Sequence, residues 1–388
     1  MPAPASPPDD PARRGLKVVI VLPPGSRFDA LKPTSIEAVV RSLARHSQDR
    51  NDLTVLCDEG ADRGDDLATV AIPPERSPRR RALALLPEIA RLRPDVVEMH
   101  QHMPSAAALT RRLRGTPTLL YRHNFLPSVK DPLTELRHRW RAGLFGGHVF
   151  CSEASRQEFA DRYPRLADRA VAISNAIDVS DWRAPARGRA PIVAFAGRAT
   201  TEKGLAPLCA SLVEVLTARP DWRAALILRD ASVNAAWTEA QLAQLAPFGD
   251  RVSVRRDTAH ETVRDLFQEA AIVVIPSLWR EPFGLVAIEA HAAGAAVVTS
   301  GTGGLSEASG DHARIVPPGD DFAARIAQTV VDLIDHPEAR EALALDGQAF
   351  VARTHDAHDR SRQLDAVRRR LRDAPAYDRM PETAGHLS

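Results

Sequence analysis

The sequence alternates short apolar runs with amphipathic stretches, and it does so twice, on either side of a segment rich in Pro, Gly and Arg. Before that segment, apolar runs occur at 16–22, 53–57, 95–99, 117–121, 148–151 and 170–174, with helical stretches at 35–45, 87–92, 105–113 and 153–161. After it, apolar runs occur at 192–196, 224–228, 252–255, 271–276 and 295–299, with helical stretches at 205–218, 239–245, 261–269 and 285–293. Such alternation is typical of parallel sheets covered by helices on both faces. The pattern therefore predicts an α/β protein of two doubly wound, Rossmann-like domains that face a central cleft.

The length of the chain agrees with two domains, because 388 residues exceed the roughly 250–300 at which a single core stops growing. We expect a first Rossmann-like domain at 16–177, a linker at 178–190 and a second Rossmann-like domain at 191–355. A helix at 356–372 follows, and it can pack back on the first domain. Tails at 1–15 and 373–388 are polar or Pro-rich and are expected to be disordered.

The cysteine pattern and the hydropathy of the sequence indicate in which cellular compartment the protein is expected. The three cysteines are isolated in or beside apolar runs, which is typical of a reducing compartment and favours neither disulfides nor a metal cluster. The first fifteen residues lack the apolar core of a secretory signal, and no run approaches the roughly 20 apolar residues of a membrane span. We therefore expect a cytoplasmic protein, either free or peripheral on the inner face of the cell membrane.

The first half of the chain is mildly basic. Residues 1–175 contain 27 Lys and Arg against 21 Asp and Glu, and basic side chains surround apolar ones at 76–93 and 137–145. Basic amphipathic segments can lie on an anionic membrane surface. A solvated helix face is the alternative, favoured for 76–93 because Pro87 interrupts the helical pattern.

The stretch 275–289, IPSLWREPFGLVAIE, carries the most chemical information. An apolar strand ends there and a helix is predicted to begin near Leu285, so the amides of Phe283, Gly284 and Leu285 form an anion site. Glu281 precedes this site and Glu289 follows one turn into the helix. Carboxylates accept hydrogen bonds from hydroxyl groups, which suits a sugar or a ribose.

A second segment, AGRATTEKG at 196–204, supplies the positive charge that two glutamates beside a phosphate need. Arg198 can bind a phosphate in a bidentate manner, and Lys203 offers a compact charge. Gly197 and Gly204 permit close approach of the backbone. The segment is no Walker loop, because the Gly-Lys-Ser/Thr sequence is missing. Surface charge in a strand–helix turn is the alternative interpretation.

Three motifs in chain order resemble those of the retaining glycosyltransferases of the GT-B fold, family 4. Glu281 and Glu289, with seven residues between them, are similar to the two-glutamate motif of that family. GRATTEKG resembles its pattern of Gly-Arg, four residues and Lys-Gly, and the stretch 289–307 places Gly294, Gly303, Gly304 and Glu307 in register. The resemblance is strong over 190–320. The chain departs from the family at 229–231 and at 255–256.

The resemblance implies roles for these residues. Arg198 and Lys203 would bind the pyrophosphate of a nucleotide-sugar donor, Glu281 would contact the transferred sugar, and Glu289 the ribose. The backbone of Phe283, Gly284 and Leu285 would bind the phosphate and the sugar. Arg198, Lys203, Glu281 and His123 would thus be the catalytic set.

The first domain would hold the acceptor, and three histidines are candidates for its side of the cleft. His100 and His102 follow one apolar run, and His123 follows the next and is most similar to the cleft histidine of the family. Gly25 follows the first run and would abut the donor phosphates. No carboxylate or cysteine accompanies the histidines at a useful spacing, and no Asp-x-Asp occurs, so no metal site is predicted.

The sequence therefore predicts a retaining, metal-independent transferase that moves a hexose from a nucleoside diphosphate sugar to a hydroxyl of a glycan or glycolipid. The nucleotide sugar is a co-substrate, no cofactor is expected, and nucleic acid is not a partner. A role in envelope polysaccharide or lipopolysaccharide synthesis is expected by analogy. The alternatives are a nucleotide-sugar-binding GT-B protein without transfer activity and a GT-B sugar phosphorylase.

Overall fold

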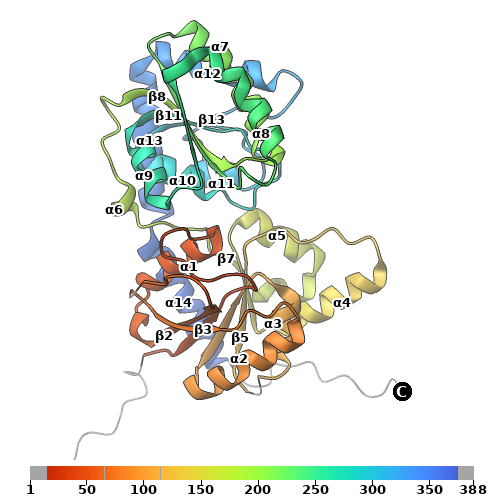
Figure 1. Ribbon diagram of the computed structural model, residues 1–388. Coiled ribbons are helices and arrows are strands. Elements are labelled where there is room, and N and C mark those ends of the chain that lie inside the picture. The colour runs from red at the N-terminus through yellow and green to blue at the C-terminus, as the bar shows by residue number, and fades with distance from the viewer. Residues whose placement is uncertain (1–14, 65, 114, 375–388) are drawn as a thin grey trace, which may run out of the picture.

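The computed structural model describes residues 15–64, 66–113 and 115–374, and these form two α/β domains stacked one above the other (Figure 1). Every ladder between named strands in both sheets is parallel, in the order β3-β2-β1-β4-β5-β6-β7 and β10-β9-β8-β11-β12-β13. The predicted fold class, two doubly wound Rossmann-like domains, is confirmed. The expected tails lie outside the described residues, except for their innermost positions.

The first sheet contains β1 (Val18–Val21), β2 (Leu53–Asp58), β3 (Ala68–Ile72), β4 (Val96–His100), β5 (Thr118–Arg122), β6 (Gly147–Phe150) and β7 (Ala170–Ala172). Its helices are α1 (Ser35–Arg45), α2 (Pro78–Leu92), α3 (Met103–Thr110), α4 (Pro132–Gly143) and α5 (Glu153–Arg162). Local sequence explains their starts, since Thr34 and Glu37 form a capping box on α1 and Asp131 caps α4.

The second sheet contains β8 (Ala190–Arg198), β9 (Arg223–Arg229), β10 (Val252–Arg256), β11 (Ala270–Ile275), β12 (Ala296–Thr299) and β13 (Arg314–Ile315). Its helices are α7 (Leu205–Ala218), α8 (Ala235–Leu242), α9 (His260–Glu269), α10 (Leu285–Ala292), α11 (Leu305–Ser309), α12 (Phe322–Asp335) and α13 (Pro337–Thr354). The central strand β11 is buried along its whole length, as expected of a strand covered on both faces.

The strand order places one switch point in each sheet. In the first sheet the order reverses between β1 and β4, and in the second between β8 and β11. Ligands of doubly wound sheets bind beyond the carboxyl ends of the strands at this point. The segments that follow β1, β4, β8 and β11 are therefore the ones that the fold makes available to a ligand.

The chain crosses between the domains twice. The first crossing contains the short helix α6 (Val179–Trp182), so the expected linker at 178–190 is partly helical and buries Trp182. The second follows α13 and leads into α14 (Ala357–Asp373), which lies among the elements of the first domain (Figure 1). The crossings are joined, because the amide of Ile177 donates to His355 O at 3.1 Å and that of Ala357 to Ile177 O at 3.0 Å.

Helix α2 differs from the sequence-based expectation. It runs through Pro87 as one helix from Pro78, whereas an interruption at the proline was predicted. The hydrogen bond that Pro87 cannot donate would go to the carbonyl of Leu83, a residue that is 55% exposed, so water can replace it. Arg81 does not lie on the surface of this basic segment, because it is buried against Asp58 at 2.6 Å.

Two other elements of the first domain were not predicted. Strand β3 is an edge strand and half-exposed, so it lacks the apolar run that marks the inner strands. Helix α4 covers only part of the basic segment 137–145, whose last residue, Phe145, is fully buried. Across the described ranges no helix has the length and apolar character required to cross a bilayer.

Candidate functional site

Two loops of the second domain are hydrogen-bonded to each other at the switch point between β8 and β11. The carbonyl of Glu202 accepts from the amide of Leu278 at 2.8 Å and from Ser277 Oγ at 3.1 Å. Gly204 brings the loops into contact, because a Cβ at this position would lie 1.9 Å from Pro276 O. The segments 196–204 and 275–289 thus form one structural unit.

Glu281 and Lys203 form an ion pair in this unit. Lys203 Nζ lies 2.5 Å from Glu281 Oε1, and Ser277 Oγ donates to the same oxygen at 2.6 Å. Glu281 is buried and Lys203 is half-buried. A carboxylate and an ammonium group therefore meet at the carboxyl end of the sheet, where a ligand can interpose between them or bind both.

The start of α10 lies immediately beside this pair. Gly284 caps the helix with φ of 115°, and the amides of Phe283, Gly284 and Leu285 make no hydrogen bond within the described part of the chain. Backbone amides at a helix start form an anion site. Gly303 and Gly304 allow the following loop to pack here, since a Cβ on either would lie within 2.5 Å of the backbone of residues 281–283.

Glu289 is buried one turn further along α10, where its Oε1 lies 3.1 Å from His260 Nε2. Burial would lower the pKa of His260, but the charge of Glu289 and the hydrogen bond to it outweigh that effect and raise the pKa. A cavity of about 220 Å³ opens here between the domains, and Glu289, His260, Leu285 and Trp182 line part of it. It is large enough for part of a nucleotide beside the carboxylate.

Arg198 ends strand β8 and is exposed. Its guanidinium makes no hydrogen bond or ion pair with any described residue. Gly197, which precedes it, lies close to the ring of Phe195. Arg198 is therefore placed at the switch point with its donors available to an anion.

Two of the three candidate histidines of the first domain lie together. His100 Nδ1 and His123 Nε2 are 2.8 Å apart, and both side chains are buried at the ends of β4 and β5. Burial, with His100 beside it, lowers the pKa of His123 well below its ordinary value. His102 is separate, since its Nδ1 lies 2.8 Å from Ser105 Oγ at the start of α3.

Gly25 occupies a turn after β1 with φ of 92°. Its amide donates to Asp58 Oδ2 at 2.7 Å, and the other oxygen of Asp58 pairs with Arg81. The turn is thus fixed by the first domain itself. No hydrogen bond or ion pair in the described ranges links Gly25 to the residues of the second domain.

The carboxyl edges of the two sheets face each other directly. Arg280 lies 3.5 Å from the ring centroid of Phe125 and 2.5 Å from Glu158 of α5. Glu307 accepts hydrogen bonds from the amide of Glu153, at 2.8 Å and 3.0 Å for its two oxygens. The histidines of the first domain therefore stand on the edge that meets the segment containing Glu281.

Three residues of this arrangement were not predicted as site residues. Ser277 and Arg280 lie in the stretch 275–289, but the sequence alone does not indicate which residues they contact. His260 has no sequence signal, because its partner Glu289 is 29 positions away. Over the described ranges, no group of three or more His, Cys, Asp or Glu side chains could hold a metal ion.

Family comparisons agree with this geometry in both domains. Residues 36–181 match a family model described as Glycosyltransferase Family 4, and residues 190–336 match one described as Glycosyl transferases group 1. Each half of the chain is thus similar to a glycosyltransferase family, and the two facing sheets have the arrangement of the GT-B fold.

Curated relatives are similar over part of the chain. The α-maltose-1-phosphate synthase of Mycolicibacterium smegmatis is 29% identical over 61% of this chain and 68% of its own length. The D-inositol 3-phosphate glycosyltransferase of Streptomyces coelicolor is 32% identical over 49% of this chain and 46% of its own. The chain thus spans about half of the length of several relatives that it matches.

Solved structures share the whole fold at low identity. A glycosyltransferase from Rickettsia africae superposes with a TM-score of 0.77 at 15% identity, covering 93% of this chain and all of the other. Anabaena HepE, crystallised with UDP-glucose, gives a TM-score of 0.71 at 18% identity and covers 90% of this chain and 98% of its own. These likenesses establish the GT-B fold.

Proposed function

We propose that the protein is a metal-independent, retaining glycosyltransferase that moves a hexose from a nucleoside diphosphate sugar to a hydroxyl group of a glycan or glycolipid. The observation that carries the proposal is the meeting of Lys203, Glu281 and the start of α10, with Glu289 one turn further along. Cations and free amides suit a diphosphate, and two buried carboxylates suit the hydroxyl groups of a sugar and a ribose.

The diphosphate is the leaving group, and the second domain supplies what stabilises it. Arg198 and Lys203 place positive charge at the switch point, and the amides of residues 283–285 donate to phosphate oxygens. Because these groups are held by the fold, they stabilise the developing charge without reorganisation. In the donor-free form Glu281 neutralises Lys203, and a bound diphosphate shares that cation.

Retention needs no covalent intermediate in this proposal. The bond between the anomeric carbon and the diphosphate oxygen breaks, and the bond from the acceptor oxygen forms on the same face. The acceptor proton passes to the departing diphosphate oxygen. His123, with His100 hydrogen-bonded behind it, lines the side on which the sugar and acceptor bind, and His102 and Gly25 follow other strands of the same sheet.

The comparisons suggest which donor to test first. HepE was crystallised with UDP-glucose, and relatives named for maltose 1-phosphate, inositol phosphate and glycogen point to small or polymeric hydroxyl acceptors. We further propose a cytoplasmic protein that works on envelope polysaccharide or lipopolysaccharide at the inner face of the membrane. Exposed apolar and basic side chains of α4 support that location.

Paired substitutions test the transfer site. Lys203→Met is expected to lower transfer from UDP-glucose, or from the nucleotide sugar that most raises the melting temperature, by at least about 100-fold. It also leaves Glu281 buried without its cation, which costs roughly 1–3 kcal/mol of stability. The double variant Lys203→Met with Glu281→Gln should recover stability but not activity.

The matched control is Glu214→Gln on the exposed face of α7, in the same domain. It should leave both the melting temperature and the turnover unchanged. If Lys203→Met turned over the donor as fast as this control, the site assignment would be wrong. Binding of nucleotide sugars without transfer or hydrolysis would instead identify a binding protein.

A further inference from the structure

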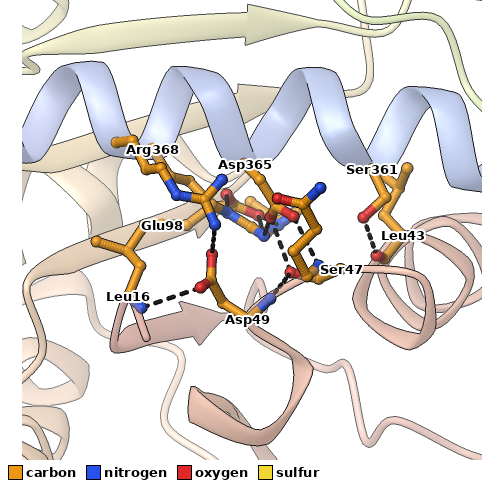
Figure 2. A network of polar contacts seen from close by, with 11 residues as sticks. Leu16, Leu43, Ser47, Asp49, Glu98, Ser361, Asp365 and Arg368 are labelled. Carbon is orange, nitrogen blue, oxygen red and sulfur yellow. Dashed lines mark hydrogen bonds and ion pairs between the residues drawn. The ribbon is translucent and has the colours of Figure 1, made fainter. Parts of the chain in front are cut away.

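A buried chain of polar contacts runs from the C-terminal helix to the histidine at the cleft. Arg368 of α14 donates to both oxygens of Glu98, at 2.9 Å and 3.0 Å (Figure 2). Glu98 Oε1 lies 2.9 Å from His100 Nε2, and His100 Nδ1 lies 2.8 Å from His123 Nε2. Glu98 and Arg368 are each 1% exposed, so no water competes along most of this path.

Glu98 is ionised in this setting. Burial alone would raise the pKa of its carboxyl, but the charge of Arg368 and the hydrogen bonds from His100 and Arg368 lower the pKa to about 2. An ionised carboxylate can only accept hydrogen bonds. His100 Nε2 must therefore carry the hydrogen of the contact to Glu98.

The position of that hydrogen determines the next one. With that one hydrogen on Nε2, His100 Nδ1 is an acceptor, so His123 Nε2 carries the hydrogen between the two rings. His123 Nδ1 is then an unprotonated acceptor. No described residue makes a hydrogen bond to this nitrogen. The nitrogen is not fully buried, so solvent reaches it.

Neighbouring residues hold the two imidazole rings in the orientations that these hydrogen bonds require. Tyr121 stacks on His100 with centroids 5.1 Å apart and on His123 with centroids 4.6 Å apart. Tyr121 is fixed in turn by its hydroxyl, which donates to Ile173 O at 3.0 Å. The amide of His123 donates to the Gln101 side chain at 2.8 Å. A 180° turn of the His100 ring would move its nitrogens away from Glu98 and His123 and would break both hydrogen bonds.

We propose that Glu98 is a positioning residue: through His100 it fixes the tautomer of His123 that presents a bare Nδ1 to a hydroxyl group of the transferred sugar. The inference rests on the proposed function, which places the sugar between His123 and the segment of Glu281. A bare nitrogen accepts a hydrogen bond from a hydroxyl and repels a phosphate or carboxylate. His123 thus selects a neutral sugar surface, while the anion-binding groups stay in the second domain.

Nitrogen NMR of full-length protein labelled with ¹⁵N-histidine reads the tautomer directly, and loss of one signal pair in His123→Gln assigns His123. The wild type is expected to show His123 protonated at Nε2 and bare at Nδ1. In Glu98→Gln the anionic acceptor is gone and the amide can donate to His100, so the Nδ1–H form of His123 should appear. A wild-type spectrum with the hydrogen on Nδ1 overturns the proposal, whether or not Glu98→Gln folds.

Ligand binding provides the second readout, with UDP-glucose and UDP as probes. Glu98→Gln should weaken UDP-glucose about 10-fold and UDP less than about 2-fold, as expected for one hydrogen bond to the sugar. The control is Asp365→Asn. Asp365 contacts Arg368 at 3.0 Å but does not contact His100, so this substitution should change neither the tautomer of His123 nor the ratio of the affinities for UDP-glucose and UDP. An unchanged ratio in Glu98→Gln contradicts the inference. Wild-type protein that shows the expected tautomer but binds neither UDP-glucose nor any other nucleotide sugar contradicts the proposed function instead.

Discussion

At the scale of single residues, Gly204 has the most exacting position in the site. Its φ is 74°, in the left-handed region, and any side chain there would meet the carbonyl of Pro276. The glycine therefore serves two purposes at once. It lets the chain turn into α7, and it presses the loop that carries Lys203 against the strand end that precedes Glu281.

A comparison of Gly204→Ala with Gly188→Ala separates the effect of the left-handed backbone from the effect of the close packing against Pro276. Gly188 has a similar φ of 65°, but a Cβ there meets nothing within 4 Å. Each substitution should cost roughly 1–2 kcal/mol for the left-handed backbone. Gly204→Ala should add the cost of moving the loop and weaken UDP-glucose binding at least about 10-fold. Urea unfolding and calorimetry measure both effects, and equal results for the two variants would contradict the packing role.

Residue patterns in the sequence predicted part of this site and missed the rest for a physical reason. Glu281, Glu289 and Lys203 stand at motif spacings, so their nearness could be anticipated. Glu98 and His260 could not be found in this way. Glu98 meets Arg368 across 270 positions of sequence, and only the packing of α14 on β4 brings them together.

At the scale of elements, helix α4 exposes large apolar side chains that do not pack in the core. Leu133, Leu136 and Trp140 are 70%, 52% and 48% exposed, and their spacing places them on one face. Arg137 and Arg139 are exposed on the same helix. Apolar side chains among basic ones are typical of helices that lie on an anionic bilayer.

The double substitution Leu136→Ser with Trp140→Ser should reduce sedimentation with vesicles of phosphatidylcholine and phosphatidylglycerol several-fold. Binding of the wild type should fall with added salt, because part of the attraction is between exposed charges. Val233→Ser, at a 73% exposed position of the second domain, is the control. Equal sedimentation of the double variant and the wild type would contradict the proposed contact of α4 with a membrane.

Inner strands could be predicted because they are buried on both faces, whereas the amphipathic helices α12 and α13 were not predicted. Inner strands such as β1 and β11 are uniformly apolar and were placed within a few residues. The edge strand β3 and the turn of α2 before Pro87 were missed, because half-exposed segments carry mixed side chains and a proline at a solvated position does not stop a helix.

At the scale of the whole molecule, buried histidines couple folding to pH. Burial, the largest influence on each, lowers the pKa of His148 and His291 to about 3 and that of His355 to about 4. In the unfolded chain they take up protons near the ordinary value of 6.5. Below that pH the unfolded state binds more protons than the folded state, so stability must fall as pH decreases.

The free energy of unfolding should therefore be greatest above about pH 6.5 and should decline below it, by up to ~1.4 kcal/mol per pH unit for each histidine. Glu98 adds a further loss between pH 4.5 and about 2, the range between its ordinary and its lowered pKa. Urea unfolding at about pH 7.5, 6.5 and 5.5 measures the slope. His148→Phe, within a cluster of phenylalanines, should flatten it, and a slope of zero in the wild type would contradict the account.

The paired crossings at Ile177 and His355 determine how the domains can move. Two backbone segments that are hydrogen-bonded side by side can bend together, but they resist being twisted around each other. The domains can therefore separate and close about one axis, while rotation around the line that joins them is restrained. Such a motion would bring the carboxyl edge of the first sheet, which carries His123, back to the same segment of the second domain. For the proposed transfer, the path of the chain, rather than the ligand, would therefore set the alignment of sugar and leaving group.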